Sequence, residues 1–267
     1  MTLVCWLVAC MEAIAINFVA DSACYEIMDD GAVRLVVCWS DNAIVAIPKV
    51  VRWHNTDYKV TRIESCAFQK CQNAKEINIP ALCSYISMSA FADCSSLENI
   101  HVDSQNYVYC DVDGVLYSKS KEQLFRYPQG KSQERFSIPI GVKRVEDNAF
   151  SHCSLLHAVD FPISLTEIGF AAFVGCHALE NVTLPDNLES IGNYAFYDCN
   201  NLITVKVLGP LPVFHDQSFS YDTYQKGVLI TEDGYQEYLS SILNSKNKHL
   251  FTNINTKDNK SQTILFE

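Results

Sequence analysis

The sequence predicts an α/β solenoid, a stack of short coils in which each coil contributes a strand and a return segment. Three observations predict this fold. A short motif returns at a fixed interval, apolar residues inside each interval have the spacing of a strand, and proline ends several of these strands. One coil alone could not bury its apolar face, so repeats of this kind are stable only when stacked.

The motif is Ala-Phe-x-x-Cys, and its five copies begin at Ala67, Ala90, Ala149, Ala172 and Ala195. Three of the four intervals are 23 residues: 67 to 90, 149 to 172 and 172 to 195. The full unit reads A-F-x-x-C-x-x-L-x-x-V-x-I-P-x-x-L-x-x-I-G. A period of about 20 to 29 residues is typical of leucine-rich repeats. Proline at the end of the strand has no N–H for the ladder and therefore stops it.

One interval is longer and indicates an insertion. Cys94 and Cys153 are 59 residues apart, and a partial unit at Phe136 to Val145 lacks its own motif. Ahead of it, two extended segments flank Asp113-Gly114, a pair that favours a tight hairpin turn. We expect an inserted β-hairpin at about residues 104–133, projecting from the solenoid, with a third extended segment around Leu124-Phe125.

With these features, the chain resembles the BspA-like leucine-rich repeat family of bacterial surface antigens. The resemblance covers roughly Phe18 to Ile254 and rests on the five motif copies, the proline-ended strands, and Asp113 to Tyr117 with Tyr127-Pro128. It implies a leucine-rich repeat solenoid that adheres to host extracellular proteins or to other cells. The departures from the repeat affect local packing and leave its period intact: Cys83 replaces Leu, and Glu64, Ser87 and Glu146 replace Gly.

The chain divides into five predicted segments. A stack needs caps because its end coils expose apolar faces. Alternation around Asp30-Gly31 predicts an N-terminal capping hairpin, and a strand at Gly227 to Ile230 with a helix at Tyr235 to Leu243 resembles a C-terminal cap. The segments are an export signal (1–15), the N-terminal capping hairpin region (16–58), leucine-rich repeats with the insertion (59–210), the C-terminal strand-helix cap (211–254) and a flexible tail (255–267).

The first residues favour export. They are apolar up to Glu12 and continue into Ala13-Ile14-Ala15, the small-x-small pattern of a signal-peptidase site, and they are too few to span a bilayer. Two other interpretations stay open. Leu7 to Cys10 resembles a lipobox, in which Cys10 would carry a lipid. Because a positively charged start is missing, the run also fits a buried N-terminal strand. Export places the protein outside the cell or on its surface.

Composition excludes several classes of partner. The 20 Lys and Arg against 31 Asp and Glu give a net charge of −11, and no basic cluster could neutralise a run of phosphates, so neither nucleic acid nor an anionic membrane surface is an expected partner. With 48% apolar and 19% charged residues, the chain can bury a sizeable core and is not disordered.

The sequence offers no chemistry for catalysis, a metal or a cofactor. Close Cys pairs such as C-x-x-C, a G-x-S-x-G elbow and glycine-rich phosphate loops are all missing. Five of the twelve cysteines occupy one repeat position, so we expect free, buried thiols whose weak S–H donor meets a loop carbonyl. Coils about 4.8 Å apart also permit disulfides between neighbouring motif cysteines.

The sheet face is the remaining candidate site. Residues between the inward-facing positions form polar columns on the open side of the strands. We expect a secreted or cell-surface binding module whose partner is a protein or glycan on a host or neighbouring cell. The columns contain Glu76, Asn78, Asn99, His101, Ser137, Asp160, Asn181, Thr183, Thr204 and Lys206.

Two alternatives remain for this surface. The face could be merely solvated, because polar residues outside a core are the default. In that case the protein would be a structural or secreted factor that acts through the inserted hairpin, by adding a strand to a partner's sheet. Exposed aromatic residues anchor interfaces, and we expect a minority of the insertion's aromatics to be free. They are Tyr107, Tyr109, Tyr117, Phe125 and Tyr127.

The export hypothesis predicts a shortened chain. If signal peptidase cuts after Ala15, the intact mass of material from its native source corresponds to a chain that starts at Ile16. A lipid-modified start at Cys10 would support the lipobox instead, and a retained Met1 would contradict both routes.

Overall fold

The computed structural model describes residues 18–215, 217–231, 253–256 and 261–263. The predicted export signal, Cys10 and the predicted helix at Tyr235 to Leu243 lie outside the described residues. The chain divides into two compact units, Met1–Gly114 and Val115–Glu267. Within the described ranges the elements are mostly strands, with one α-helix, so the predicted repeat solenoid is confirmed as a β-solenoid.

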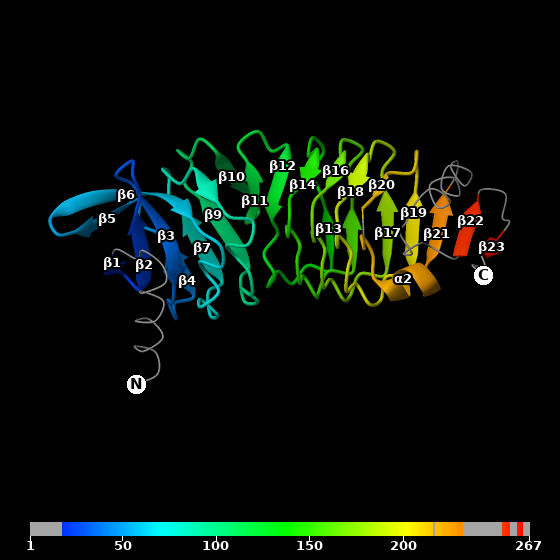
Figure 1. Cartoon of the computed structure of the whole chain (residues 1–267), viewed down its shortest axis with the longest axis horizontal. Coiled ribbons are helices and arrows are strands. Elements are labelled where there is room, and N and C mark those ends of the chain that lie inside the picture. Colours follow the sequence, from blue (N-terminus) through cyan, green and yellow to red (C-terminus); the bar gives the residue numbers. More distant parts are fainter. Residues whose placement is uncertain (1–17, 216, 232–252, 257–260, 264–267) are drawn as a thin grey trace. The chain divides into compact units, whose positions relative to one another are not determined.

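The first unit joins a cap to the first coils. Its strands are β1 (Phe18–Ala20), β2 (Ala23–Ile27), β3 (Val33–Cys38), β4 (Ile44–Ala46), β5 (Val50–Trp53), β6 (Thr56–Ile63), β7 (Glu76–Ile79), β8 (Tyr85–Ile86), β9 (Asn99–Val102) and β10 (Tyr109–Val112). Strands β1, β2 and β3 pair antiparallel, and β3 then pairs parallel with β6. Strands β4, β7 and β9 form a parallel sheet (Figure 1).

The cap hairpin joins β2 to β3 through a turn that contains Asp30 and Gly31. Cys24 pairs with Val37 across β2 and β3, and the connection contains Gly31 at a φ of 77°, a left-handed conformation that costs glycine little. A β-bulge between Cys24 and Tyr25 shifts the register in which β2 pairs with β3. Because β3 also pairs with β6, the hairpin closes the open edge of the first coils.

The second unit is a stack of coils. Its elements are β11 (Val115–Ser118), β12 (Gln123–Arg126), β13 (Arg135–Ser137), β14 (Arg144–Val145), β15 (Ala158–Asp160), β16 (Glu167–Ile168), β17 (Asn181–Leu184), β18 (Ser190–Ile191), β19 (Thr204–Val207), β20 (Val213–Phe214), α2 (Tyr221–Lys226), β21 (Val228–Thr231), β22 (Asn253–Thr256) and β23 (Ser261–Thr263). Each coil contributes one strand to each of two parallel ladders, and Figure 1 shows β14 and β16 in one row and β13 and β17 in another.

The ladders keep the 23-residue register that the sequence predicts. In one ladder β14, β16, β18 and β20 pair through Val145, Ile168, Ile191 and Phe214. In the other, β17, β19 and β21 pair in parallel, and β13 pairs with β15. Equivalent residues of successive coils therefore lie directly beside one another, at the strand spacing of about 4.8 Å.

A column of stacked aromatic rings forms the core of the second unit. The ring centroids are 5.1 Å apart for Tyr127 and Phe150, 4.6 Å for Phe150 and Phe173, 5.0 Å for Phe173 and Phe196, and 5.2 Å for Phe196 and Phe219. Every ring is at most 1% exposed. Burial of each side chain contributes about 1.5 to 3 kcal/mol. In the first unit Phe68 and Phe91 stack in the same way, at 5.3 Å.

Four of the five motif cysteines, one in the first unit and three in the second, are free thiols packed beside stacked rings of their own unit, as predicted for this repeat position. Each sulfur donates a hydrogen bond to the carbonyl of the aromatic residue one coil earlier. The Sγ–O distances are 3.5 Å for Cys94 to Phe68, 3.8 Å for Cys153 to Tyr127, 3.1 Å for Cys176 to Phe150 and 3.1 Å for Cys199 to Phe173. Burial raises the pKa of Cys153 and of Cys199 to about 12. Both thiols are therefore protonated and unreactive near neutral pH.

The insertion forms strands but does not project from the coils. Strand β11 pairs antiparallel with β12, and β12 pairs in parallel register with β14 through Leu124 and Val145. Tyr127 then occupies the ring position that Phe holds in the other coils. A tyrosine ring can continue the column because it has the size and planarity of phenylalanine. The expectation of a projecting hairpin is corrected: β12 begins a coil.

The coils also continue beyond residue 210, where the sequence suggested a cap. Phe219 stacks on Phe196, and β21, predicted as a strand at Gly227 to Ile230, extends the ladder of β19. Part of the predicted flexible tail is also in strands, since β22 pairs with β21 and β23 pairs with β22. This difference has a physical reason: the edge strand of a sheet has unpaired N–H and C=O groups that a further strand satisfies.

Replacement of one ring should destabilise the stack. In Phe173→Ala we expect the free energy of unfolding to fall by about 3 to 5 kcal/mol, because the cavity lies between two rings that cannot collapse onto each other. Chemical denaturation measures this change. Leu155→Ala is the matched control, since Leu155 is 50% exposed and its loss should cost less than about 0.5 kcal/mol. Similar losses in the two variants would contradict the assignment of the core.

The packing thiols should be hidden in the native protein. We expect Cys94, Cys153, Cys176 and Cys199 to resist alkylation until the protein is denatured, without any need for a reductant. Peptide mapping after native and denatured alkylation measures this. Cys176→Ser should cost on the order of 1 to 2 kcal/mol, through a buried hydroxyl and lost contacts. A linked pair among these four cysteines would show the assignment to be wrong.

Candidate functional site

The polar face of the second unit lies on β13, β15, β17 and β19. Along β17 the exposed residues Asn181 and Thr183 alternate with the buried residues Val182 and Leu184. The alternation follows from the pleat, because inward residues must be apolar to fill the coil and outward residues are free of that demand. Thr204 and Lys206, on β19, lie beside Asn181 and Thr183 in register and are half-buried.

An ion pair lies at the centre of this face. Arg135 Nε donates to Asp160 Oδ2 at 2.9 Å, its Nη2 donates to Oδ1, and Ser137 Oγ donates to Oδ2 at 2.7 Å. The hydrogen bond from Arg135, followed by that from Ser137, lowers the pKa of the Asp160 carboxyl below its ordinary value. The carboxylate is therefore charged and held in one orientation, although its side chain is 41% exposed.

A hollow of about 400 Å³ adjoins this pair. Arg135, Asp160, Asn181 and Thr183 line it, together with His157, whose Nδ1 is 2.9 Å from the Leu155 carbonyl oxygen. The hollow thus combines a cation, an anion, an amide and a hydroxyl on adjacent strands. Such a set can bind a partner's hydroxyl, amide or charged groups through several directed hydrogen bonds.

The predicted face residues of the first unit lie on β7 and β9. Glu76 pairs with Asn99 and Asn78 with His101 across the two strands. The His101 ring lies between two carboxylates, with Nε2 3.7 Å from Glu76 Oε2 and Nδ1 3.5 Å from Asp111 Oδ2. A hollow of about 510 Å³ here is lined by Lys49, Asn78, His101 and Asp103, among others.

The aromatic residues of the insertion are mostly in the core. Tyr109, Tyr117 and Tyr127 are at most 4% exposed, and Phe125 is half-buried. The Tyr109 hydroxyl accepts a hydrogen bond from the Ile86 N–H at 3.1 Å. Tyr107, at 68% exposed, is the aromatic side chain of this group that a partner can reach readily.

Arg135 stands two residues before Ser137 on β13, and this spacing already places both side chains on the outward face. Sequence reasoning missed a cluster that we call the aromatic ridge: Phe170, Tyr194 and Tyr197. These rings are 46%, 37% and 44% exposed, with edge-to-face centroid distances of 5.7 and 5.5 Å. In the sequence, Tyr194 directly precedes a motif copy and Tyr197 lies within that copy, whereas Phe170 stands two residues before the preceding copy.

The backbone at Tyr194 is strained. Its φ is 58°, a left-handed conformation that is uncommon for a bulky residue and costs about 1 to 2 kcal/mol relative to the right-handed region. Asn148, at the equivalent position two coils earlier, has the same conformation, which asparagine tolerates well. Ala171 and Gln217, at the equivalent positions of the neighbouring coils, have φ values of 50° and 55°, so the left-handed conformation is a feature of the repeat.

Within the described residues, no cluster of three or more His, Cys, Asp or Glu side chains is arranged to hold a metal ion. The part of the chain that the structure describes has no helix of sufficient length and apolar character to cross a membrane.

The Asp160 carboxyl gives a direct test of this geometry. In Arg135→Ala we expect the pKa of Asp160 to rise toward its ordinary value, since its main hydrogen-bond donor is lost. Ser137→Ala, which removes the second donor, should produce a smaller rise. A titration of the carboxyl carbon by NMR measures both shifts. An unchanged Asp160 pKa in Arg135→Ala would show that the ion pair does not form in solution.

Comparison with known proteins assigns the family. The model for the BspA type leucine rich repeat region matches six copies, over residues 51–112 and 121–257. Comparison with curated proteins gives no match. A leucine-rich repeat protein from Eubacterium ventriosum is similar in structure, with 19% identity, a TM-score of 0.55, and coverage of 82% of this chain and 78% of that one.

A second similar structure, a leucine-rich repeat protein from Bacteroides ovatus, has 21% identity and a TM-score of 0.44, with coverage of 80% of this chain and 71% of the other. At 19% identity, the Eubacterium ventriosum structure bears on the fold alone. The family model accounts for most of the sequence, including every copy of the Ala-Phe-x-x-Cys motif. The chain belongs to the BspA-type leucine-rich repeat family.

Proposed function

We propose that the protein is a secreted or cell-surface binding module that recognises a protein or glycan of a host or neighbouring cell through the polar face of its second unit. The observation that carries this proposal is the hollow beside Arg135 and Asp160, with Asn181 and Thr183 on the adjacent strand. Leucine-rich repeats generally serve as binding scaffolds, and membership of this family supports the same role.

The polar face is rigid before any partner arrives. Its strands pair in register as two pairs, β13 with β15 and β17 with β19, and the Asp160 carboxylate is already oriented by Arg135 and Ser137. A partner that binds there loses little conformational entropy on the protein's side, so a few polar contacts can suffice. Because the groups are charged and partly exposed, we expect modest affinity that falls as the salt concentration rises.

Localisation and partner class rest on the sequence. The small-x-small pattern at Ala13 to Ala15 supports export, and the resemblance to bacterial surface antigens supports a partner outside the cell. Lipidation at Cys10 would tether the same module to a membrane. Adhesion is the role that this combination favours, with no part for nucleic acid given the net charge of −11.

The alternative, action through the inserted hairpin, has less support. Strand β12 is paired with β14, and three of the five aromatic side chains are in the core. The aromatic ridge is the better second candidate, because the strained backbone of Tyr194 holds an exposed ring between two others. Clustered aromatic side chains are the residue type that most often anchors an interface.

A binding screen with matched variants tests the proposal. The purified chain is applied to immobilised extracellular-matrix proteins and to a glycan array at low and high salt. We expect a salt-sensitive ligand that Asp160→Ala with Thr183→Ala weakens by at least about tenfold, since each lost polar contact is worth about 1 kcal/mol. Tyr107→Ala is the control in the insertion, and Tyr194→Ala with Tyr197→Ala reports on the aromatic ridge.

The outcomes separate the surfaces. Loss only in the ridge variant would move the site to the aromatic ridge, and loss only in Tyr107→Ala would favour the insertion. Either result would overturn the polar face as the binding site. A ligand that still binds all three variants would also overturn the polar face as the binding site.

A further inference from the structure

The first motif cysteine differs from the four that follow it. Cys94, Cys153, Cys176 and Cys199 each donate to a carbonyl one coil earlier. Cys71 instead has its thiol in a hydrogen bond with the thiol of Cys38, and the Ser40 backbone N–H reaches both sulfurs. The chain before Cys71 belongs to the cap. There the partner of the Cys71 sulfur is a cysteine, instead of the backbone carbonyl of an aromatic residue.

Backbone contacts hold the two cysteines in adjacent layers. Cys38 ends β3, and its N–H donates to the carbonyl oxygen of Ala67 at 2.7 Å, in the same turn of chain as Cys71. Cys71 is 0% exposed and Cys38 is 4% exposed. Both thiols are therefore in the cap-to-coil junction of the first unit.

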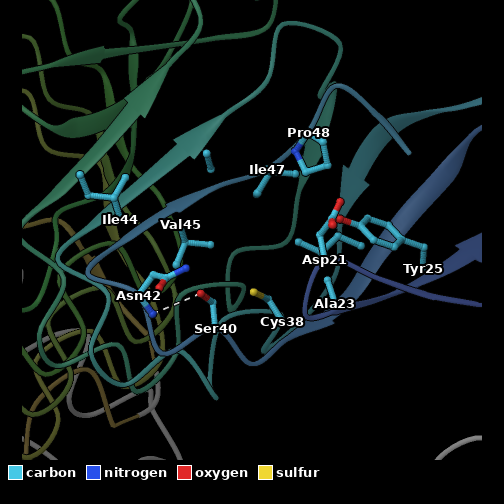
Figure 2. A pocket seen from close by; sticks show the side chains of 12 residues that line it. Asp21, Ala23, Tyr25, Cys38, Ser40, Asn42, Ile44, Val45, Ile47 and Pro48 are labelled. Atoms are coloured by element: carbon cyan, nitrogen blue, oxygen red, sulfur yellow. Dashed lines mark hydrogen bonds between the residues drawn. The ribbon is translucent and has the colours of Figure 1, made fainter. Parts of the chain in front are cut away.

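Cys38 has an approach that Cys71 lacks. It lines a cavity of about 280 Å³ together with Asp21, Tyr25 and Ser40, and Figure 2 shows its side chain among these residues. Cys71 is not among the residues that line this cavity. A small molecule that enters the cavity would thus meet the Cys38 sulfur first.

We propose that Cys38 and Cys71 form a reactive thiol pair, a modification site at which a small organic disulfide is reduced and the cap becomes covalently linked to the first repeat. The Cys38 thiolate attacks one sulfur of the small disulfide, forms a mixed disulfide and expels a thiolate. The Cys71 thiol then loses its proton as its sulfur attacks the Cys38 sulfur and expels the second thiolate. The two cysteines lose two electrons and two protons, and the small disulfide becomes two thiols.

The electrostatics of the pair favour this order of events. The hydrogen bond from Cys71, aided by the Ser40 N–H, lowers the pKa of Cys38 below its ordinary value against the opposing effect of burial. The same hydrogen bond and burial raise the pKa of Cys71. Asp21 also faces the cavity, and Tyr25 stays neutral because burial raises the pKa of its hydroxyl. Cys38 is thus the attacking thiolate and Cys71 the resolving thiol.

The test uses oxidised glutathione as the small disulfide on the native full chain, with Cys66→Ser and Cys110→Ser to remove two partly exposed thiols. Free thiols are then trapped in denaturant, and non-reducing peptide mapping locates the products. We expect one linkage, between Cys38 and Cys71. Its rate of formation should rise with pH to a midpoint below that of an unperturbed thiol, which is about 8.5.

Three variants in this background assign the roles. Cys71→Ser should stop at a glutathione adduct on Cys38, Cys38→Ser should leave Cys71 reduced, and Cys153→Ser, a motif cysteine in the second unit, should keep the linkage. Circular dichroism checks that each variant folds, with Cys71→Ala as the substitute if the serine does not. Unmodified Cys38 in the parent, or a linkage of Cys38 to Cys24 instead, would overturn the proposal.

Discussion

The contact between successive Ala-Phe pairs is the constraint on which the second unit depends. The Phe173 N–H donates to the carbonyl oxygen of Ala195 at 2.7 Å, while the two rings of Phe173 and Phe196 stack at 5.0 Å. One contact fixes the rise from coil to coil and the other excludes water from the interior. A shift by one residue would bury polar side chains in place of apolar ones, so the 23-residue register follows from these contacts.

The chemistry of the surface is free to vary because the core is uniform. Inward positions repeat nearly the same residues, whereas the outward positions of β13, β15 and β17 carry Arg135, Asp160 and Asn181. The fold therefore supplies outward-facing positions at regular strand spacing, and the side chains at those positions determine what is bound. The orientation of Asp160 by two neighbours shows how outward residues can also organise one another without the core.

Sequence reasoning predicted what the period enforces and missed what it does not. The inward Phe and Cys of each motif, the Asp30-Gly31 hairpin and the polar columns all follow from spacing. The place of Tyr127 in the ring column could not be predicted in this way, because its coil lacks the motif. The aromatic ridge depends on how far each turn exposes its flanking residues, and the Cys38–Cys71 contact joins a cap residue to a repeat through tertiary structure alone.

Native-state hydrogen exchange tests most directly whether the Ala-Phe contacts hold the stack together. The amides of Phe150, Phe173 and Phe196 each donate to a carbonyl of the next coil at 2.7 Å. The account predicts that these three amides exchange together, with the highest protection in the second unit, because they can open only when coils separate. It would be contradicted if they exchanged as rapidly as amides in exposed turns such as that of Leu155.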